Sequence, residues 1–180
     1  VTLSADQVLE VIGSVLANAG DISLTSTNRD IDLSAATALV NAVAGQVTAT
    51  AAAGAVTVQE VRAGTGVTLN ADLALTILSN IVSTAGDVTV GSENGEVNAA
   101  AGTLLHALAG SVSATSVTGP VTVGQVHSTA EIDLTGSQGV TVTNELNSES
   151  GAVQLTADAG PLEIRDILAA EDIQLSAAES

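Results

Sequence analysis

Hydrophobic and polar residues alternate along the chain in short runs that recur at regular intervals. The recurring unit is Gly-x-[Val/Ile]-x-[Leu/Val/Ala], in which every second residue is apolar. Such alternation predicts a β-strand with one buried face. The first apolar position of the unit falls at nine places: Val1, Ile22, Val47, Val67, Val88, Val112, Ile132, Val153 and Ile173.

Most units contain further alternating runs after the first. A second run is clear at residues 31–33, 56–58, 121–123 and 140–142, and glycines precede several of these runs. A third apolar cluster follows the second run around Val61, Leu104, Leu105, Val126, Leu146 and Ile167. Each period is therefore predicted to hold two or three short strands separated by turns.

A slower repeat is superimposed on the first. The successive intervals between units are 21, 25, 20, 21, 24, 20, 21 and 20, so three units make a super-repeat whose period is 65 to 66. The segment VTLSAD at residue 1 returns as VTLNAD at residue 67, and residues 45–61 match residues 110–126 at 9 of 17 positions. The extra residues of the long units lie in two similar segments, residues 35–45 and 100–110.

Two or three alternating strands in each of these intervals predict an all-β fold, a right-handed parallel β-helix (β-solenoid) with one unit per coil. The whole chain, residues 1–180, is expected to be one continuous solenoid segment, an internal piece of a longer array. The nine unit positions above should stack as one inward column. A second inward column should contain Leu3, Leu24, Ala49, Leu69, Val90, Ala114, Leu134, Leu155 and Leu175.

One alternative stays open for two apolar segments. Residues 6–20 and 73–86 also fit helical spacing, as at Val8, Val11, Val15 and Leu16. A mixed strand-and-helix solenoid, such as a leucine-rich repeat, would show this pattern, and so would a short helical turn in these coils. The asparagine ladder and fixed leucine spacing of leucine-rich repeats are missing.

The composition narrows the function classes. The chain has 46% hydrophobic residues but no Phe, Tyr, Trp, Met or Cys, and 20 acidic residues against three arginines give a formal charge of −17. Nucleic-acid binding is excluded because it needs cations to neutralise phosphates. The apolar stretches are too short to span a membrane, and disulfides are excluded. A core of small aliphatic residues suits a narrow solenoid.

The Gly-Asp-[Ile/Val]-x-[Leu/Val] strands that begin at Gly20 and Gly86 and the lysine-free composition rich in Ser, Thr, Ala and Val resemble the filamentous-haemagglutinin family. These are giant exoproteins of two-partner secretion and related bacterial adhesins. The resemblance extends over all 180 residues, through composition and periodicity. It implies a β-helical shaft located outside the cell or on the bacterial cell surface.

Few residues suggest chemistry. His106 and His127 are 21 residues apart, so they could lie side by side on neighbouring coils and bind a metal ion or respond to pH. The plainer interpretation is that both are surface residues at equivalent corners of their coils. Acidic turns could bind Ca²⁺, although they lack the glycine-rich nonapeptide of calcium β-rolls and a solvated surface explains them. These acidic residues are Asp21, Asp30, Asp32, Asp87, Glu93 and Glu96.

No catalytic, cofactor-binding or metal-binding residue is assigned, and the chain is not expected to be an enzyme or to need a cofactor. A catalytic groove for polysaccharides would need convergent carboxylates, usually with aromatic platforms, and the chain has no aromatic residue. The outward residue of the first strand is Thr or Ser in the units up to Ser113, which would form a ladder of hydroxyl groups, but it is Asp133, Gln154 and Gln174 in the last three units. This change disfavours an ice-binding plane.

The predicted function is mechanical: a stalk or shaft segment of a bacterial surface adhesin or extracellular filament. One alternative is a carbohydrate- or receptor-binding module whose ligand contacts the segments 35–45 and 100–110. Another is a subunit that stacks end to end into filaments. The expected partners are neighbouring coils or copies of the same array, and a host receptor or polysaccharide, with no nucleic acid and no membrane span.

Overall fold

The computed structural model describes residues 1–178, and this part of the chain contains strands and turns without a helix. One strand of every coil belongs to a nine-stranded parallel sheet, here called the first sheet. Its strands are β1 (Thr2–Ala5), β4 (Ile22–Ser26), β7 (Gln46–Ala51), β10 (Gly66–Ala71), β13 (Val88–Ser92), β16 (Val112–Ser116), β19 (Ile132–Gly136), β21 (Val153–Ala157) and β23 (Ile173–Ala177).

The other strands form the second sheet, which is also parallel and lies opposite the first. One of its columns contains β2 (Leu9–Glu10), β5 (Ile31–Leu33), β8 (Val56–Val58), β11 (Leu75–Ile77), β14 (Val97–Ala99) and β17 (Val121–Val123). The neighbouring column contains β3 (Val15–Ala17), β6 (Leu39–Ala42), β9 (Glu60–Ala63), β12 (Ile81–Ser83), β15 (Leu104–Ala107) and β18 (Gln125–Ser128). Two long strands, β20 (Val140–Ser148) and β22 (Leu162–Ala169), extend across both columns.

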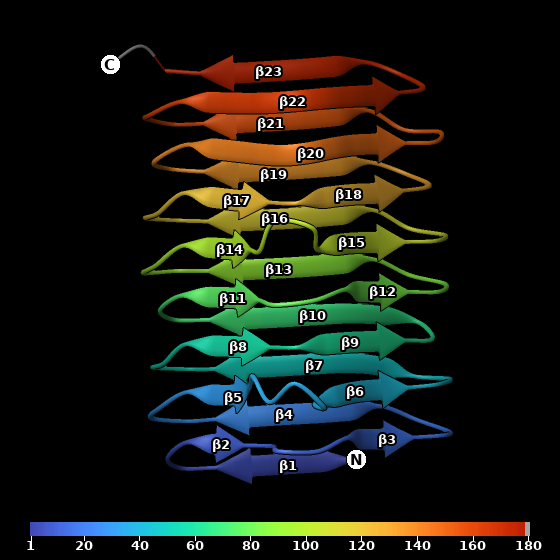
Figure 1. Ribbon diagram of the computed structural model, residues 1–180, viewed down its shortest axis with the longest axis vertical. Helices are drawn as coiled ribbons and strands as arrows, with labels where there is room; N and C mark the ends of the chain where they lie inside the picture. Colours follow the sequence, from blue (N-terminus) through green and yellow to red (C-terminus); the bar gives the residue numbers. More distant parts are fainter. Residues whose placement is uncertain (179–180) are drawn as a thin grey trace.

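The two sheets wind into a straight, flattened solenoid (Figure 1). Eight coils each place one strand in the first sheet and one or two in the second, and β23 begins a ninth coil. The second sheet lies nearer to the viewer in Figure 1. The chain runs rightward along it and leftward along the first sheet while it rises, so the winding is right-handed, as predicted.

The register of the first sheet confirms both predicted columns, and their members are buried except near the two ends of the stack, where Val1, Ile173 and Leu175 are about half exposed. Ile22 pairs with Val47, Val47 with Val67, and the same column continues without a shift to Ile173. In the second column, Leu24 pairs with Ala49 and Leu134 with Leu155. Register is strongly specified here because a slip of one residue would turn every apolar side chain towards solvent.

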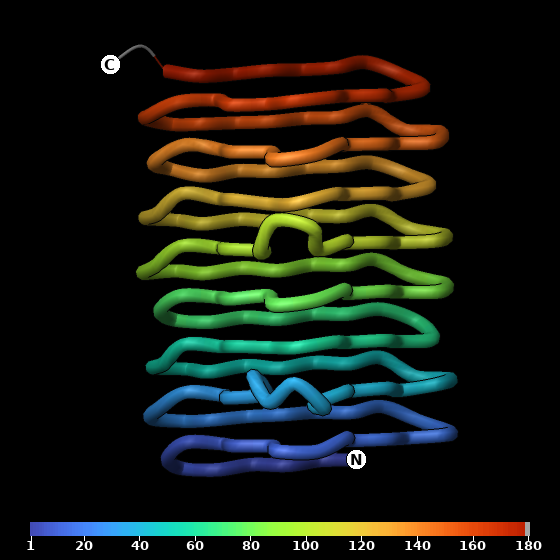
Figure 2. The backbone as a smooth tube through the Cα atoms, viewed as in Figure 1, coloured from blue at the N-terminus to red at the C-terminus, as the bar shows by residue number. Residues whose placement is uncertain are grey.

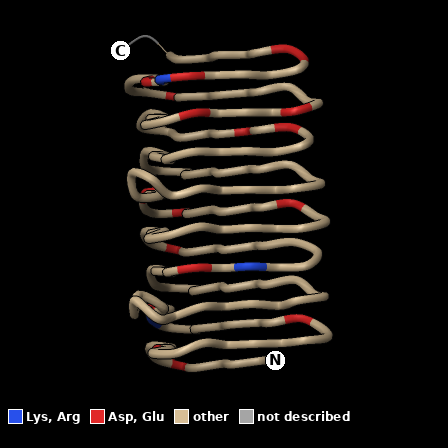
Figure 3. The backbone as a smooth tube through the Cα atoms, turned by 45° about the vertical axis from the view of Figure 1, so that its right-hand side comes forward, with Lys and Arg blue, Asp and Glu red and all other residues tan. Residues whose placement is uncertain are grey.

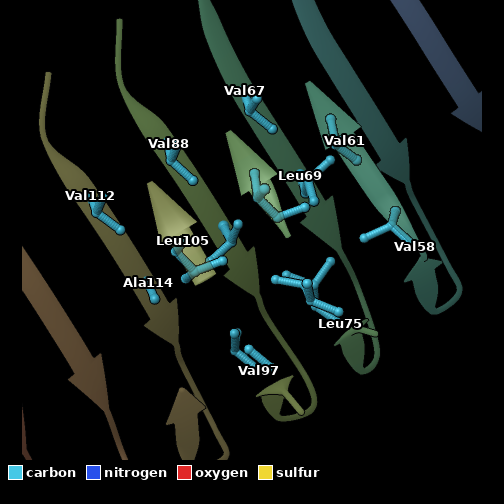
Figure 4. Close-up of a cluster of buried hydrophobic side chains, with 14 of the residues drawn as sticks. Val58, Val61, Val67, Leu69, Leu75, Val88, Val97, Leu105, Val112 and Ala114 are labelled. Carbon is cyan, nitrogen blue, oxygen red and sulfur yellow. The ribbon is translucent and has the colours of Figure 1, made fainter. Parts of the chain in front are cut away.

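The core is a thin apolar layer between the two sheets. Figure 4 shows Val67, Leu69 and Val88 of the first sheet facing Leu75 and Leu105 of the second, with their side chains between the ribbons. These five residues are at most 1% exposed. A layer this narrow has room for Val, Leu, Ile and Ala, which explains how the chain folds without aromatic residues.

Glycines at the turn before the first-sheet strands let neighbouring coils approach closely. Gly20 has a φ of +101°, and a Cβ on Gly45 would lie 2.3 Å from the carbonyl oxygen of Gly20. A Cβ on Gly110 would lie 2.6 Å from the carbonyl carbon of Gly86 and from Oδ1 of Asp87. Contact between coils therefore requires the glycine of the sequence unit at Gly45 and Gly110.

The helical alternative is wrong for residues 6–20. This segment forms the short strands β2 and β3. Val8, Ile12 and Leu16, which a buried helix would have covered, are 47%, 71% and 53% exposed. Pairing of β2 with β5 and of β3 with β6 provides the backbone hydrogen bonds, so stacking on the next coil overrides the local helical spacing.

The helical alternative is also wrong for residues 73–86, which form β11 and β12. Leu75 and Ile77 of β11 and Ile81 of β12 are fully buried. Both strands are paired on each side, with the coils before and after them. The apolar positions of this segment therefore serve two strands of the second sheet.

The two long coils accommodate their extra residues as loops between the strands of the second sheet. One loop spans residues 34–38, and the other spans residues 100–103 (Figure 2). The amide of Ala38 donates to the carbonyl of Ala35 at 2.8 Å, and that of Thr103 donates to Ala100 at 3.0 Å. Both loops bulge from the wall, so they thicken the rod locally without interrupting the stack.

Candidate functional site

The two histidines lie next to each other on the outer face of the second sheet. His106 of β15 is the register partner of His127 of β18, so they occupy neighbouring coils as the spacing suggested. Their ring centroids are 5.8 Å apart, and the rings meet edge to face at 87°. The expected corner position is wrong, because both residues lie within strands rather than at a turn.

Polar side chains surround this pair. Nε2 of His127 lies 3.1 Å from Nε2, the side-chain amide nitrogen, of Gln125 and 3.9 Å from a carboxylate oxygen of Glu145 on β20. The pKa of His106 is lowered, first by burial and then by the charge of His127, while Glu149 acts in the opposite direction. This lowered pKa favours the neutral form of His106.

The acidic turns form bonds between coils. Oδ1 of Asp21 accepts the amide of Gln46 at 2.9 Å, and Oδ1 of Asp87, one super-repeat later, accepts the amide of Ser111 at 2.8 Å. Each of these carboxylates thus accepts a hydrogen bond from a backbone amide of the next coil. That amide belongs to the first residue of the first-sheet strand, or to the residue just before it. Such carboxylates hold neighbouring coils together at the turn.

The other candidate calcium ligands are dispersed. Asp30 accepts the amide of Ala55 on the next coil at 2.8 Å, whereas Asp32 of β5 accepts the amide of Ser34, just after the same strand, at 2.9 Å. Glu93 and Glu96 are exposed. Within residues 1–178, no three or more His, Asp or Glu side chains gather closely enough to hold a metal ion. Figure 3 shows acidic residues distributed along the rod.

Several buried serines at the ends of strands, although not Ser83 of β12, make a second set of bonds that the sequence analysis missed. Ser116 is 1% exposed, and its hydroxyl donates to the carbonyl of Gly95 on the preceding coil at 2.6 Å. The same oxygen accepts the amide of Gly119 in its own turn at 2.9 Å. Ser92 makes equivalent bonds to Leu73 and Gly95. Serine at the last inward position of a strand, three residues before a glycine, was the available signal.

The outer face of the first sheet presents two hydroxyl ladders rather than one. The second ladder pairs Thr25 with Thr50 and Thr115 with Thr135, and it is interrupted by Asn70 and Gly91. A shallow, open hollow of about 500 Å³ lies at this interruption. Residues of the long-coil segments 35–45 and 100–110 do not line it, but a second open hollow of about 490 Å³ is lined in part by Asn41, Ala42 and Val43 of the segment 35–45.

Comparisons with protein-family models, curated proteins and solved structures produced no match to this chain. The likeness to filamentous haemagglutinins therefore remains a prediction from composition and periodicity. In the part of the chain that the structure describes, there is no helix with the length and hydrophobicity needed to cross a membrane.

Proposed function

We propose that this chain is a rigid spacer, a shaft segment of a bacterial surface adhesin or extracellular filament. The observation that carries the proposal is the first sheet, in which nine strands stack in parallel without a register shift. Repeat arrays of this kind are quasi-one-dimensional, so their length grows in proportion to the number of repeats. That property is what a spacer needs.

Several features would make the rod stiff. Every coil is bonded to the next through both sheets, through turn carboxylates such as Asp87 and through buried hydroxyls such as Ser116. The core residues of consecutive coils form one continuous cluster along the axis. Bending would have to open these contacts on one side of the rod, and the two opposed sheets resist this.

The surface suits a rod exposed at high density. The formal charge of −17 repels neighbouring copies, and exposed acidic residues occur along its length (Figure 3). The absence of cysteine means that folding does not depend on the redox state of the surroundings. These properties support an extracellular or cell-surface location, which the resemblance to filamentous haemagglutinins also implies.

Removing whole coils tests the proposal. The chain would be displayed between a membrane anchor and an epitope tag, with and without residues 67–131, which make one three-coil super-repeat. At about 4.8 Å per coil the tag should approach the membrane by about 14 Å. Energy transfer from a dye on the tag to a membrane dye measures this height.

The control replaces the same segment, residues 67–131, with a flexible Gly/Ser linker of equal length. A flexible segment has an end-to-end distance that grows with the square root of its length, so the tag height should be broadly distributed. A tag height that does not change when three coils are removed, or that equals the height with the flexible linker, would contradict a spacer function.

A further inference from the structure

The histidine pair is a departure from the super-repeat. In the first super-repeat, Asn41 of β6 pairs with Arg62 of β9. The equivalent positions one super-repeat later are His106 of β15 and His127 of β18, which pair in the same way. The inward neighbours on these strands are buried in both super-repeats. The alternation of buried and outward positions is therefore repeated, while the outward pair has changed from Asn and Arg to two histidines.

From this juxtaposition we propose that His106 and His127 together bind one divalent transition-metal ion, with Zn²⁺ or Ni²⁺ as the representative cation. Adjacent parallel strands hold the two imidazoles with centroids 5.8 Å apart on a partly exposed face. Rotation of the side chains from the edge-to-face arrangement would direct one nitrogen of each ring to a shared ion. Imidazole is a preferred ligand of these metals, whereas Ca²⁺ and Mg²⁺ prefer oxygen.

The surroundings favour a cation at this place. Glu145 lies 3.9 Å from Nε2 of His127, and Gln125 contacts the same ring nitrogen. The register neighbours that flank the pair along the column are Val82 of β12 and Asn147 of β20, and neither carries a charge. Because residues 1–178 contain no group of three or more His, Asp or Glu side chains that could hold a metal ion, water would complete the coordination.

Such an ion would join two coils. His106 belongs to the fifth coil and His127 to the sixth, so coordination would add a link across the strand pair β15–β18. It would lie on the second sheet immediately after the loop formed by residues 100–103. The loop bulges from the wall between β14 and β15 (Figure 2), and the ion would strengthen the contact between two coils beside it.

Isothermal titration calorimetry of the full chain with ZnCl₂, and separately with NiCl₂, tests the proposal after the protein has been treated with a chelator and dialysed. We expect the titration to show one ion bound per chain by the pair His106 and His127. His106→Asn and His127→Asn should each weaken binding by at least about tenfold, since changes even to outer-shell partners of metal ligands cost about 10 to 100-fold. Both side chains point outward, so the variants should keep the circular dichroism spectrum of the parent.

A transplant provides the matched positive control. The double substitution Asn41→His and Arg62→His places the same pair at the equivalent site, so the stoichiometry should rise from one ion to two. Binding that is unchanged in the two single variants would place the ion on the acidic surface instead and overturn the proposal. Absence of binding by the parent chain, or a transplant that adds no second ion, would overturn it equally, and CaCl₂ should give no signal that depends on the histidines.

Discussion

Truncation of Leu134 to alanine should destabilise the rod strongly. Leu134 is fully buried and lies in the inward column between Ala114 below and Leu155 above. The Leu134→Ala substitution removes three carbon groups from the core, which corresponds to about 2.4 kcal/mol of lost transfer free energy at about 0.8 kcal/mol each. Because Ala114 is too small to fill the space, a cavity remains, and the total loss should reach about 3 to 5 kcal/mol.

The matched control is Asp133→Asn on the same strand. Asp133 is adjacent to Leu134 but points outward, and its carboxylate accepts a bond from Thr135 at 3.3 Å. Its replacement should change the free energy of unfolding by no more than about 0.5 kcal/mol. Urea denaturation followed by far-ultraviolet circular dichroism is the assay, because the chain has no aromatic residue to report by fluorescence. Equal losses in the two variants would refute the assignment of inward and outward positions.

Three further predictions concern the turns and the histidine pair, and the same urea assay measures all of them. Gly110→Ala should destabilise the chain by about 1 to 3 kcal/mol, because its Cβ would lie 2.6 Å from the backbone of Gly86. Gly13→Ala is the control and should not destabilise it, because no atom lies within 4 Å of the added Cβ. Similar losses of stability in the two variants would contradict the close approach of neighbouring coils. Asp87→Ala should lower the free energy of unfolding by about 0.5 to 1.5 kcal/mol, because it removes the acceptor for the amide of Ser111. Asp87→Asn keeps an acceptor oxygen and should lose less. Equal losses in the two variants would count against a contribution from this hydrogen bond. With EDTA present, the free energy of unfolding should decrease as the pH falls below about 6.5. The pKa of His106 is lowered in the folded chain, so the unfolded chain binds the proton more readily. An unchanged pH profile in His106→Asn would show that other groups cause the decrease.

The inward columns could be predicted from the sequence because a two-residue period with one buried face permits one register. The pattern therefore predicts the alignment of Leu24, Ala49 and Leu69 correctly, including the long coil between the first two. The same argument failed where local spacing was ambiguous. In residues 6–20, the apolar positions fit a helix as well as a strand, and pairing with the following coil decided the outcome.

The contacts between coils could not be predicted, since they depend on how one turn lies over the next. A solvated carboxylate at Asp21 would fit the sequence equally well, and only the stacked turn brings the amide of Gln46 within 2.9 Å. The buried hydroxyl of Ser116 likewise needs the carbonyl of Gly95 from the preceding coil. For the histidines, the sequence indicated neighbouring coils, but their place within strands followed from where β15 and β18 begin.

The most direct test of the central claim, a straight rod with a constant rise per coil, is a distance between two labelled coils. The chain contains no cysteine, so spin labels can be attached at Ser23→Cys and Gln154→Cys, outward positions six coil steps apart on the first sheet. Double electron–electron resonance should give a narrow distribution near about 29 Å, and the pair Ser23→Cys and Asp133→Cys should be shorter by about 4.8 Å. A broad distribution, or distances that do not decrease with the number of coils, would contradict the account.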